Sequence, residues 1–135
     1  MKYLLDVNAL LALGFLEHEF HQRMTHWLNH LASGGIPELA STAITELGFV
    51  RILCQAPQYG LRIDDAQTLL ARLKTHKTIH WSFLSDDLGV ERMPRWVKSP
   101  KQLADGHLAE LAHAHGMTLA TFDSGIPGVF VIPCQ

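Results

Sequence analysis

The chain has 135 residues, 47% hydrophobic and 18% charged, which is typical of one folded domain and excludes an extended disordered chain. The formal net charge of −2 gives no overall sign of nucleic-acid binding, and the longest apolar run, around residues 9–16, is too short to span a bilayer. Lys2 followed by apolar residues resembles the start of a signal peptide, but Asp6 and Asn8 interrupt the apolar segment and no small-residue cleavage site follows. We therefore expect a single domain over residues 1–135, located in the cytoplasm.

The first half of the chain predicts strands and helices in alternation. Apolar residues recur with the spacing of one helical stripe from Phe20 onward, and Gly34-Gly35 ends that stripe. Ser41 or Thr42 is a suitable N-cap for the helix that follows. The expected elements are a strand at 2–5, helices at 9–17 and 20–31, a strand at 37–40 and a helix at 41–55.

The second half continues the same alternation. Asp64 and Gln67 have the spacing of a capping box, which predicts that a helix begins at Asp64. Ser99-Pro100 suits the start of another helix. The remaining expected elements are a strand at 79–84, a helix at 99–115, and strands at 118–122 and 129–132. This order indicates an α/β fold with a mostly parallel sheet covered by helices on both faces.

Positive charge is concentrated between residues 72 and 101, a stretch that contains seven Lys and Arg residues and three acids. The pattern fits either a solvated surface or a basic face that binds a polyanion. Trp96 lies between Arg95 and Lys98, where its ring could stack on a base or pack in an interface. The basic residues are Arg72, Lys74, Lys77, Arg92, Arg95, Lys98 and Lys101.

Two acids follow predicted strands. Asp6 ends the first strand and Asp123 ends the strand at 118–122. Ligands of parallel α/β sheets bind beyond the carboxyl ends of the strands, so the two acids fall where a site is expected. Each position also suits a helix N-cap, and the sequence leaves both interpretations open.

Two further acids lie on the apolar faces of predicted helices. Glu46 shares a face with Val50 and Leu53, and Asp105 shares one with Leu108 and Ala112. An acid in such a place is costly unless it is paired, protonated or bound to a metal.

Obvious cationic partners for the four acids are few, and the nearest in sequence to Glu46 is Arg51. A hard divalent cation, Mg²⁺ or Mn²⁺, would satisfy all four together. The pattern therefore predicts a metal pocket suited to phosphoryl chemistry.

Four segments carry a family resemblance: LLDVNALLAL, TELGFVRIL, DGHLAELAHAHG and LATFDSGI. Together they resemble the PIN domain, and more closely the VapC toxins of bacterial toxin–antitoxin pairs, from residue 2 to about residue 131. The resemblance implies an α/β/α sandwich whose four acids bind Mg²⁺ or Mn²⁺ and cleave RNA. By position these catalytic and metal-binding acids are Asp6, Glu46, Asp105 and Asp123.

The resemblance also implies supporting residues. Asn8 matches the polar residue that follows the first acid, and Thr121 matches the hydroxyl residue before the last. Arg51 matches a basic residue that could contact RNA or an antitoxin. The sequence departs from the family pattern at Ala104, where Thr or Ser is frequent, and at Gly106, where Ala is common. Neither change removes a ligand, so we expect an intact site.

The resemblance further implies partners: an RNA substrate such as tRNA or rRNA, whose cleavage arrests growth, a VapB-like antitoxin that covers the pocket, and a second copy in a homodimer. No membrane partner is expected. Phe20, Trp27 and the helix at 41–55 are expected to supply the apolar surface shared between subunits.

Two alternative functions remain open. One is a haloacid-dehalogenase-type phosphatase with Asp6 as nucleophile, and the other is an inactive PIN-fold regulatory or binding module. The histidines at 18, 21, 26 and 30 have spacings that fit a zinc site, but surface or interface roles are favoured for them.

Overall fold

Five parallel strands form the single sheet of this protein, for which the computed structural model describes residues 1–134. The strand order is β3-β2-β1-β4-β5. The chain therefore adds β2 and β3 on one side of β1 and then β4 and β5 on the other side. The crevice between the carboxyl ends of β1 and β4 is thus the expected ligand site. The strands are β1 (Lys2–Leu5), β2 (Glu38–Thr42), β3 (His80–Leu84), β4 (Thr118–Thr121) and β5 (Phe130–Val131).

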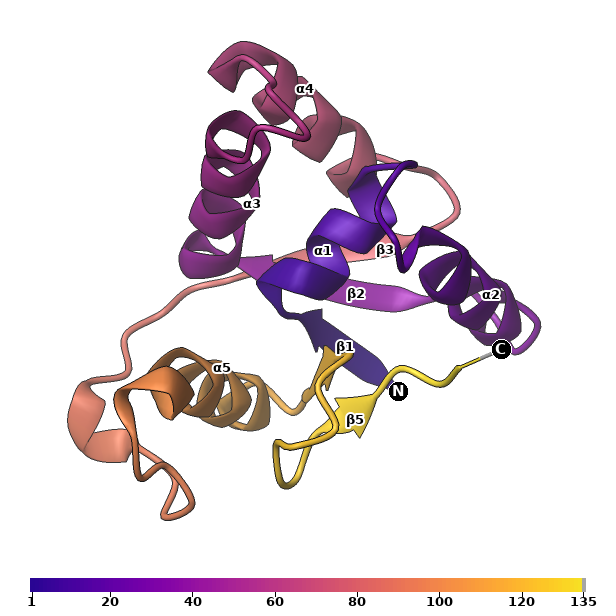
Figure 1. Cartoon of the computed structure of the whole chain (residues 1–135). Helices are drawn as coiled ribbons and strands as arrows, with labels where there is room; N and C mark the ends of the chain where they lie inside the picture. The colour runs from indigo at the N-terminus through magenta and orange to yellow at the C-terminus, as the bar shows by residue number, and fades with distance from the viewer. Residues whose placement is uncertain (135) are drawn as a thin grey trace.

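Helices cover both faces of the sheet, and the predicted α/β fold is confirmed. Figure 1 shows the first four helices on one face and α5 on the other. Alternate residues of β1 explain both layers, because Leu5 packs into the core beneath the four helices whereas Leu4 packs against Leu108 of α5. The helices are α1 (Val7–Gly14), α2 (His21–Ala32), α3 (Ala43–Gln55), α4 (Ile63–Lys74) and α5 (Leu103–Ala114), with 3₁₀ turns η1 (Val90–Arg92) and η2 (Pro100–Gln102).

Three predicted helix boundaries are wrong. Helix α1 begins at Val7 because Asp6 is its N-cap. The capping box predicted from Asp64 does not form, since α4 begins at Ile63 and its N-cap, Arg62, makes no side-chain capping bond. The helix predicted from residue 99 is a 3₁₀ turn followed by α5. Within the described residues, none of the helices has the length and hydropathy that a transmembrane span requires.

Candidate metal-dependent active site

Asp6 lies at the junction of β1 and α1 and is only 8% exposed. Its Oδ1 accepts a hydrogen bond of 2.8 Å from the backbone N–H of Ala9, so the carboxylate caps α1. Its own backbone N–H donates to the carbonyl of Ala120 in β4, at 3.2 Å. Asp6 therefore lies where the carboxyl ends of β1 and β4 meet, and it is at once the N-cap of α1 and an acid at a strand end.

Thr121 links Asp6 to Asp123. The buried hydroxyl of Thr121 accepts a hydrogen bond of 3.1 Å from the backbone N–H of Asp123, and it donates one to the carboxylate of Asp6. The exposed Asp123 is held in a turn, where its Oδ1 accepts from the N–H of Gly125 at 2.8 Å. Both carboxylates are thus oriented by bonds that leave some of their oxygen lone pairs free.

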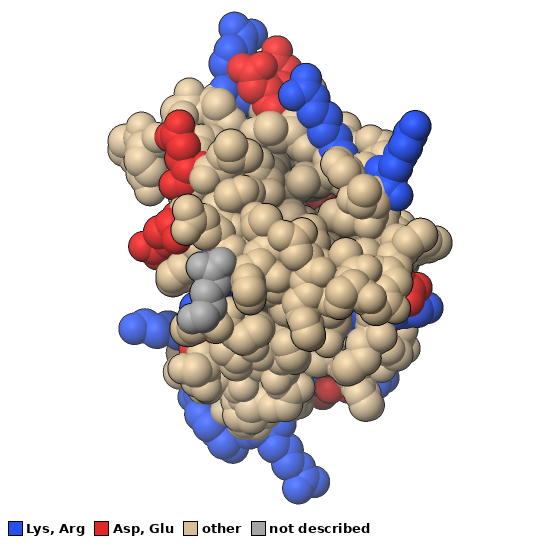
Figure 2. Space-filling model, turned by 90° about the vertical axis from the view of Figure 1, so that its right-hand side faces the viewer, with Lys and Arg blue, Asp and Glu red and all other residues tan. Residues whose placement is uncertain are grey.

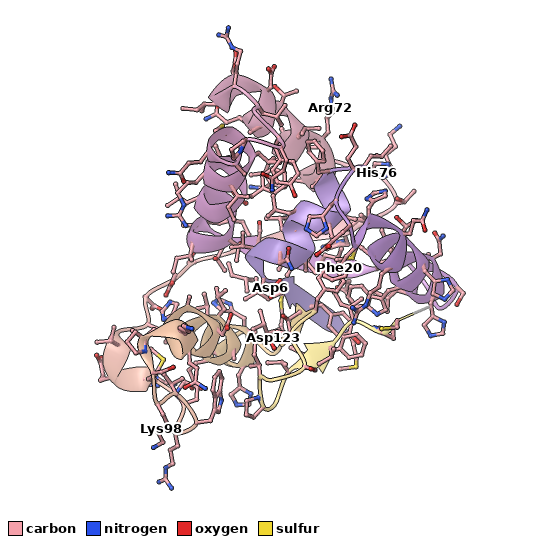
Figure 3. All side chains as sticks on the ribbon, in the orientation of Figure 1. Asp6, Phe20, Arg72, His76, Lys98 and Asp123 are labelled. Atoms are coloured by element: carbon pink, nitrogen blue, oxygen red, sulfur yellow. The ribbon has the colours of Figure 1, made fainter. Side chains whose placement is uncertain are left out.

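Asp6, Asp105 and Asp123 act on one another electrostatically, and we call these three the aspartate site. Burial raises the pKa of Asp6, and repulsion from Asp105 and Asp123 raises it further, against the hydrogen bonds from Thr121 and Ala9. Burial and repulsion from Asp123 raise the pKa of Asp105. Figure 3 shows Asp6 and Asp123 facing the region between the sheet edge and α5. Three elements far apart in sequence therefore bring negative charge to one place.

The donor chemistry of the aspartate site fits a hard divalent cation. All three side chains offer carboxylate oxygens, and Mg²⁺ is held by one or two such groups together with waters and substrate phosphates. In the described part of the chain, no three His, Cys, Asp or Glu side chains converge tightly enough to hold a metal by themselves. The carboxylate donors of the aspartate site are the ligands that Mg²⁺ and Mn²⁺ prefer, whereas structural zinc sites are built from thiolate and imidazole ligands.

Glu46 has partners that the sequence did not reveal. Its Oε2 lies 2.8 Å from Nζ of Lys74 and accepts a hydrogen bond of 2.6 Å from the hydroxyl of Ser41. Ser41 in turn accepts from Nε1 of Trp81 at 3.0 Å. Arg51 is the nearest cation to Glu46 in sequence, but the cation that pairs with Glu46 in the structure is Lys74, which reaches it from a neighbouring helix. The charges that raise the pKa of Asp6 come from the other two aspartates, whereas Glu46 lies in an ion pair.

Asn8, to which the resemblance assigns a supporting role, has a partner that the sequence does not reveal. Asn8 is exposed in the first turn of α1, and its Oδ1 lies 2.9 Å from Nε2 of His18. His18 is 9% exposed, so the surface role considered for it was wrong. No spacing in the sequence signals the pair, because His18 lies in the irregular segment between α1 and α2.

The predicted contact residues lie in separate regions. Arg51 is exposed on α3, beside an apolar groove, whereas Arg95, Trp96 and Lys98 lie in the segment before η2. Arg95 and Lys98 are exposed and Trp96 is half-buried, so Trp96 offers only part of its ring to a base.

The basic run between residues 72 and 101 does not form one face. Figure 3 shows Arg72 and Lys98 at opposite ends of the molecule. Figure 2 shows Lys and Arg projecting from the two ends of the right-hand side of Figure 1, with few charges between them. Arg92 is also paired, with Glu110 at 3.5 Å. Of the two interpretations of this run, the single basic face is therefore not supported, because its residues lie on separate parts of the surface.

Known proteins resemble this chain over nearly its whole length. Ribonuclease VapC44 of Mycobacterium tuberculosis is 41% identical over 131 residues, covering 93% of this chain and 89% of the relative. Ribonuclease VapC38 of the same organism is 35% identical over 129 residues, covering 91% and 86%.

The crystal structure of VapBC2 from Rickettsia felis, bound to a DNA fragment from its promoter, contains a chain with the same fold. Its TM-score is 0.59 at 15% identity, with 97% of both chains covered. The PIN domain family matches residues 3–129. The resemblance seen in the four sequence motifs is confirmed: this chain belongs to the PIN domain family.

Proposed function

We propose that this protein is a Mg²⁺- or Mn²⁺-dependent endoribonuclease and the toxin of a VapBC-type toxin–antitoxin pair. The observation that carries the proposal is the aspartate site, in which burial and mutual repulsion raise the pKa of Asp6, at the carboxyl end of β1, and of Asp105, in the first turn of α5. A divalent cation relieves such repulsion. The relatives that bear the name ribonuclease support the same activity.

Each residue of the site has a proposed role. Asp6, Asp105 and Asp123 would hold the cation, which when bound activates a water and stabilises charge on the phosphate. Thr121 keeps the carboxylate of Asp6 directed into the crevice. Glu46 is the proposed fourth acid, and it reaches this role only after its ion pair with Lys74 opens or through a bridging water.

The proposed substrate is RNA, possible targets being tRNA or rRNA, and its cleavage would arrest growth in the cytoplasm. Arg95 and Lys98 are exposed in the segment before α5, the helix that carries Asp105, and we propose that they contact phosphates of the bound RNA. The half-buried Trp96 would contribute an edge or part of one face.

Two protein partners are part of the proposal. A VapB-like antitoxin would place a basic side chain against the three carboxylates and so mask the aspartate site. A second copy of this chain would pack on the face made by α3, α4 and β3. In that face Leu47, Ile63 and Phe83 are exposed and line an apolar groove of about 620 Å³.

The residues first expected to make the dimer surface are corrected. Trp27 is 2% exposed and belongs to the core, where its ring packs against Tyr3 and Phe130. Phe20 packs against Phe122. The apolar surface of α3 remains available, with Arg51 exposed beside it.

The activity is tested by incubating the purified protein with total RNA in Mg²⁺ and in EDTA, and by sequencing the new RNA 5′ ends. We expect cleavage in Mg²⁺, none in EDTA, and none by Asp6→Asn, an isostere that lacks the ligand charge. The matched control is Asp64→Asn, an exposed acid of α4. Cleavage by Asp6→Asn at the parent rate would overturn the role of Asp6.

The same experiment separates the alternatives. An inactive PIN-fold module would leave RNA intact in Mg²⁺. A haloacid-dehalogenase-type phosphatase would form an acyl-phosphate on Asp6, which mass spectrometry detects, and PIN domain membership already argues against it.

A further inference from the structure

Asn8 and His18 form a hydrogen-bonded pair in which Asn8 lies in the first turn of α1, close in sequence to Asp6 of the aspartate site. Asn8 is exposed, two residues after Asp6, and its Oδ1 lies 2.9 Å from Nε2 of His18. His18 is buried in the segment that joins α1 to α2. A buried histidine that bonds an exposed amide beside three carboxylates calls for an explanation beyond packing.

The hydrogen bonds of His18 fix which ring nitrogen carries the proton. The backbone N–H of Phe20 donates to Nδ1 of His18 at 3.0 Å, so Nδ1 has a free lone pair and no hydrogen. The proton of the neutral ring is therefore on Nε2, which donates to Oδ1 of Asn8. Burial lowers the pKa of His18 and favours this neutral form.

This tautomer also fixes the orientation of the Asn8 amide. The amide oxygen faces Nε2–H of His18, and the amide NH₂ group projects from the other side of the same carbon. A flipped amide would place the NH₂ donor of Asn8 against the Nε2–H donor of His18. Because the oxygen of Asn8 faces His18 and the residue is exposed, its two N–H donors point away from His18 and are accessible to a ligand.

The segment that holds His18 is anchored to the opposite side of the site. The ring of Phe20 lies 4.8 Å from that of Phe122, the neighbour of Asp123, and the guanidinium of Arg23 lies over both rings at 5.4 and 5.0 Å. Figure 3 shows Phe20, Asp6 and Asp123 in one region of the molecule. His18 therefore connects the first turn of α1 to the end of β4 through rigid aromatic contacts.

We propose that Asn8 donates hydrogen bonds from Nδ2 to a phosphate oxygen of bound RNA, and that His18 is the positioning residue that holds the amide in this orientation. The proposal rests on the proposed function, since the ligand is a phosphodiester. Three carboxylates repel a phosphate, and a neutral donor attracts it without adding a charge that competes for the cation. This role distinguishes Asn8 from a metal ligand, because its oxygen already accepts from His18.

Two substitutions of His18 separate its two hydrogen bonds. In His18→Gln the amide nitrogen reaches the place of Nε2, so the bond to Asn8 is kept. His18→Asn can accept from the N–H of Phe20 but does not reach Asn8. We expect His18→Asn to lower kcat/KM for RNA cleavage about tenfold, the effect of losing one well-placed hydrogen bond, and His18→Gln to restore most of that loss. The matched control is His26→Asn, an exposed histidine of α2.

A double-mutant cycle distinguishes positioning from general loss of structure. In the Asn8→Ala background, His18→Asn should cause no further loss of cleavage, because the group that it positions is gone. If the losses in kcat/KM of the two single variants multiply in the double variant, or if His18→Asn cleaves RNA like the parent, the positioning role of His18 is overturned. Asn8→Asp should weaken RNA binding, because a charged acceptor replaces the amide donor, whereas a metal-ligand role for Asn8 predicts tighter Mg²⁺ binding from the added carboxylate.

Nitrogen NMR of the parent provides a readout that does not depend on cleavage. The ¹⁵N shifts of His18 should show a protonated Nε2 and an unprotonated Nδ1 at neutral pH. A short single-stranded RNA, added in Ca²⁺ in place of Mg²⁺ to slow cleavage, should shift the side-chain N–H signals of Asn8.

The reversed tautomer, or Asn8 signals that stay fixed while RNA binds, would overturn the inference. A parent protein that neither binds nor cleaves RNA would instead overturn the proposed function and the phosphate role of Asn8 with it. In that case the ring nitrogens would still decide whether His18 holds the Asn8 amide.

Discussion

Lys74 and Glu46 form an ion pair in which Nζ and Oε2 are 2.8 Å apart, with the two side chains 30% and 19% exposed. The ammonium group also lies 5.0 Å from the centre of the Phe83 ring. The pair joins α4 to the first turn of α3 and neutralises an acid that the family resemblance assigns to metal binding. A cation from the protein thus occupies one of the oxygens that a metal would need.

Replacing Lys74 tests whether Glu46 takes part in metal binding. Lys74→Met keeps most of the apolar stem and frees Glu46, so half-maximal cleavage should require less Mg²⁺ than in the parent. The free energy of unfolding should fall by about 0.5–1 kcal/mol, the usual contribution of a partly exposed pair. A Mg²⁺ titration of cleavage and a thermal melt measure the two effects. Lys77→Met, at an exposed site, is the control, and an unchanged Mg²⁺ midpoint would argue that Glu46 does not bind the ion.

The charge of the aspartate site should make stability depend on pH. The pKa of Asp6 and of Asp105 is raised in the folded protein, so the folded state binds protons more readily than the unfolded chain. The free energy of unfolding of the metal-free protein should therefore fall as the pH rises from about 4, the ordinary pKa of Asp, through the raised values. Asp105→Asn should reduce this fall and increase the melting temperature near neutral pH in EDTA.

Adding Mg²⁺ should reverse the order of the melting temperatures of the parent and Asp105→Asn. The ion binds the folded site and raises the melting temperature of the parent by mass action, and the rise should be smaller in Asp105→Asn. Asp64→Asn, which changes an exposed acid of α4, should behave like the parent in both buffers. An equal Mg²⁺ shift in Asp105→Asn and the parent would place the ion elsewhere.

Thr121 offers a test of how the aspartates are held. Thr121→Val keeps the shape but removes the donor to Asp6 and the acceptor for the N–H of Asp123. Because these groups are buried or partly buried, the variant should lose about 1–2 kcal/mol of stability and most of its cleavage activity. Thr121→Ser keeps the hydroxyl and should stay close to the parent in both assays. If Val and Ser variants cleave equally, the hydroxyl does not orient the site.

The proposed dimer can be tested on α3. Leu47 is 69% exposed, and Leu47→Lys would bury two ammonium groups in an interface that repeats the same patch on both copies. We expect light scattering to give a dimer for the parent and a monomer for the variant at micromolar concentrations. Leu16→Lys changes a leucine that is 80% exposed in the segment after α1, and it should remain dimeric. A monomeric parent would overturn the proposed homodimer.

Periodicity along the chain predicted the order of elements and placed Asp6 and Asp123 at the carboxyl ends of strands. That these two ends meet depends on the pairing of β1 with β4, which only the structure shows. The membership of Asp105 in the site could be predicted from its place on the apolar face of a helix. The ion pair of Glu46 with Lys74 and the bond of Asn8 with His18 could not, since each joins elements whose packing is set by tertiary contacts.

Trp27 shows the same limit of sequence patterns. An aromatic residue on a helical stripe suits either a core or an interface, and only the packing of Tyr3 and Phe130 around its ring decides for the core.

Gly106 lies in α5 against the segment 93–97. The sequence alone suggests that Gly106→Ala stabilises α5 by up to about 1 kcal/mol, because Ala is the better helix former. The structure predicts the opposite sign. A Cβ at this position would overlap with Val97 and would lie 2.9 Å from Sδ of Met93, in the segment that also carries Arg95 and Trp96.

Gly106→Ala should therefore lower the melting temperature and weaken RNA binding, because the segment 93–97 must move away from α5. Space for the new methyl group can be restored by Val97→Ala, so the double variant should recover part of both losses relative to Gly106→Ala. Thermal melts and RNA binding in Ca²⁺ measure the two effects. A Gly106→Ala variant that melts higher and binds RNA like the parent would show that helix propensity outweighs the contact with Val97.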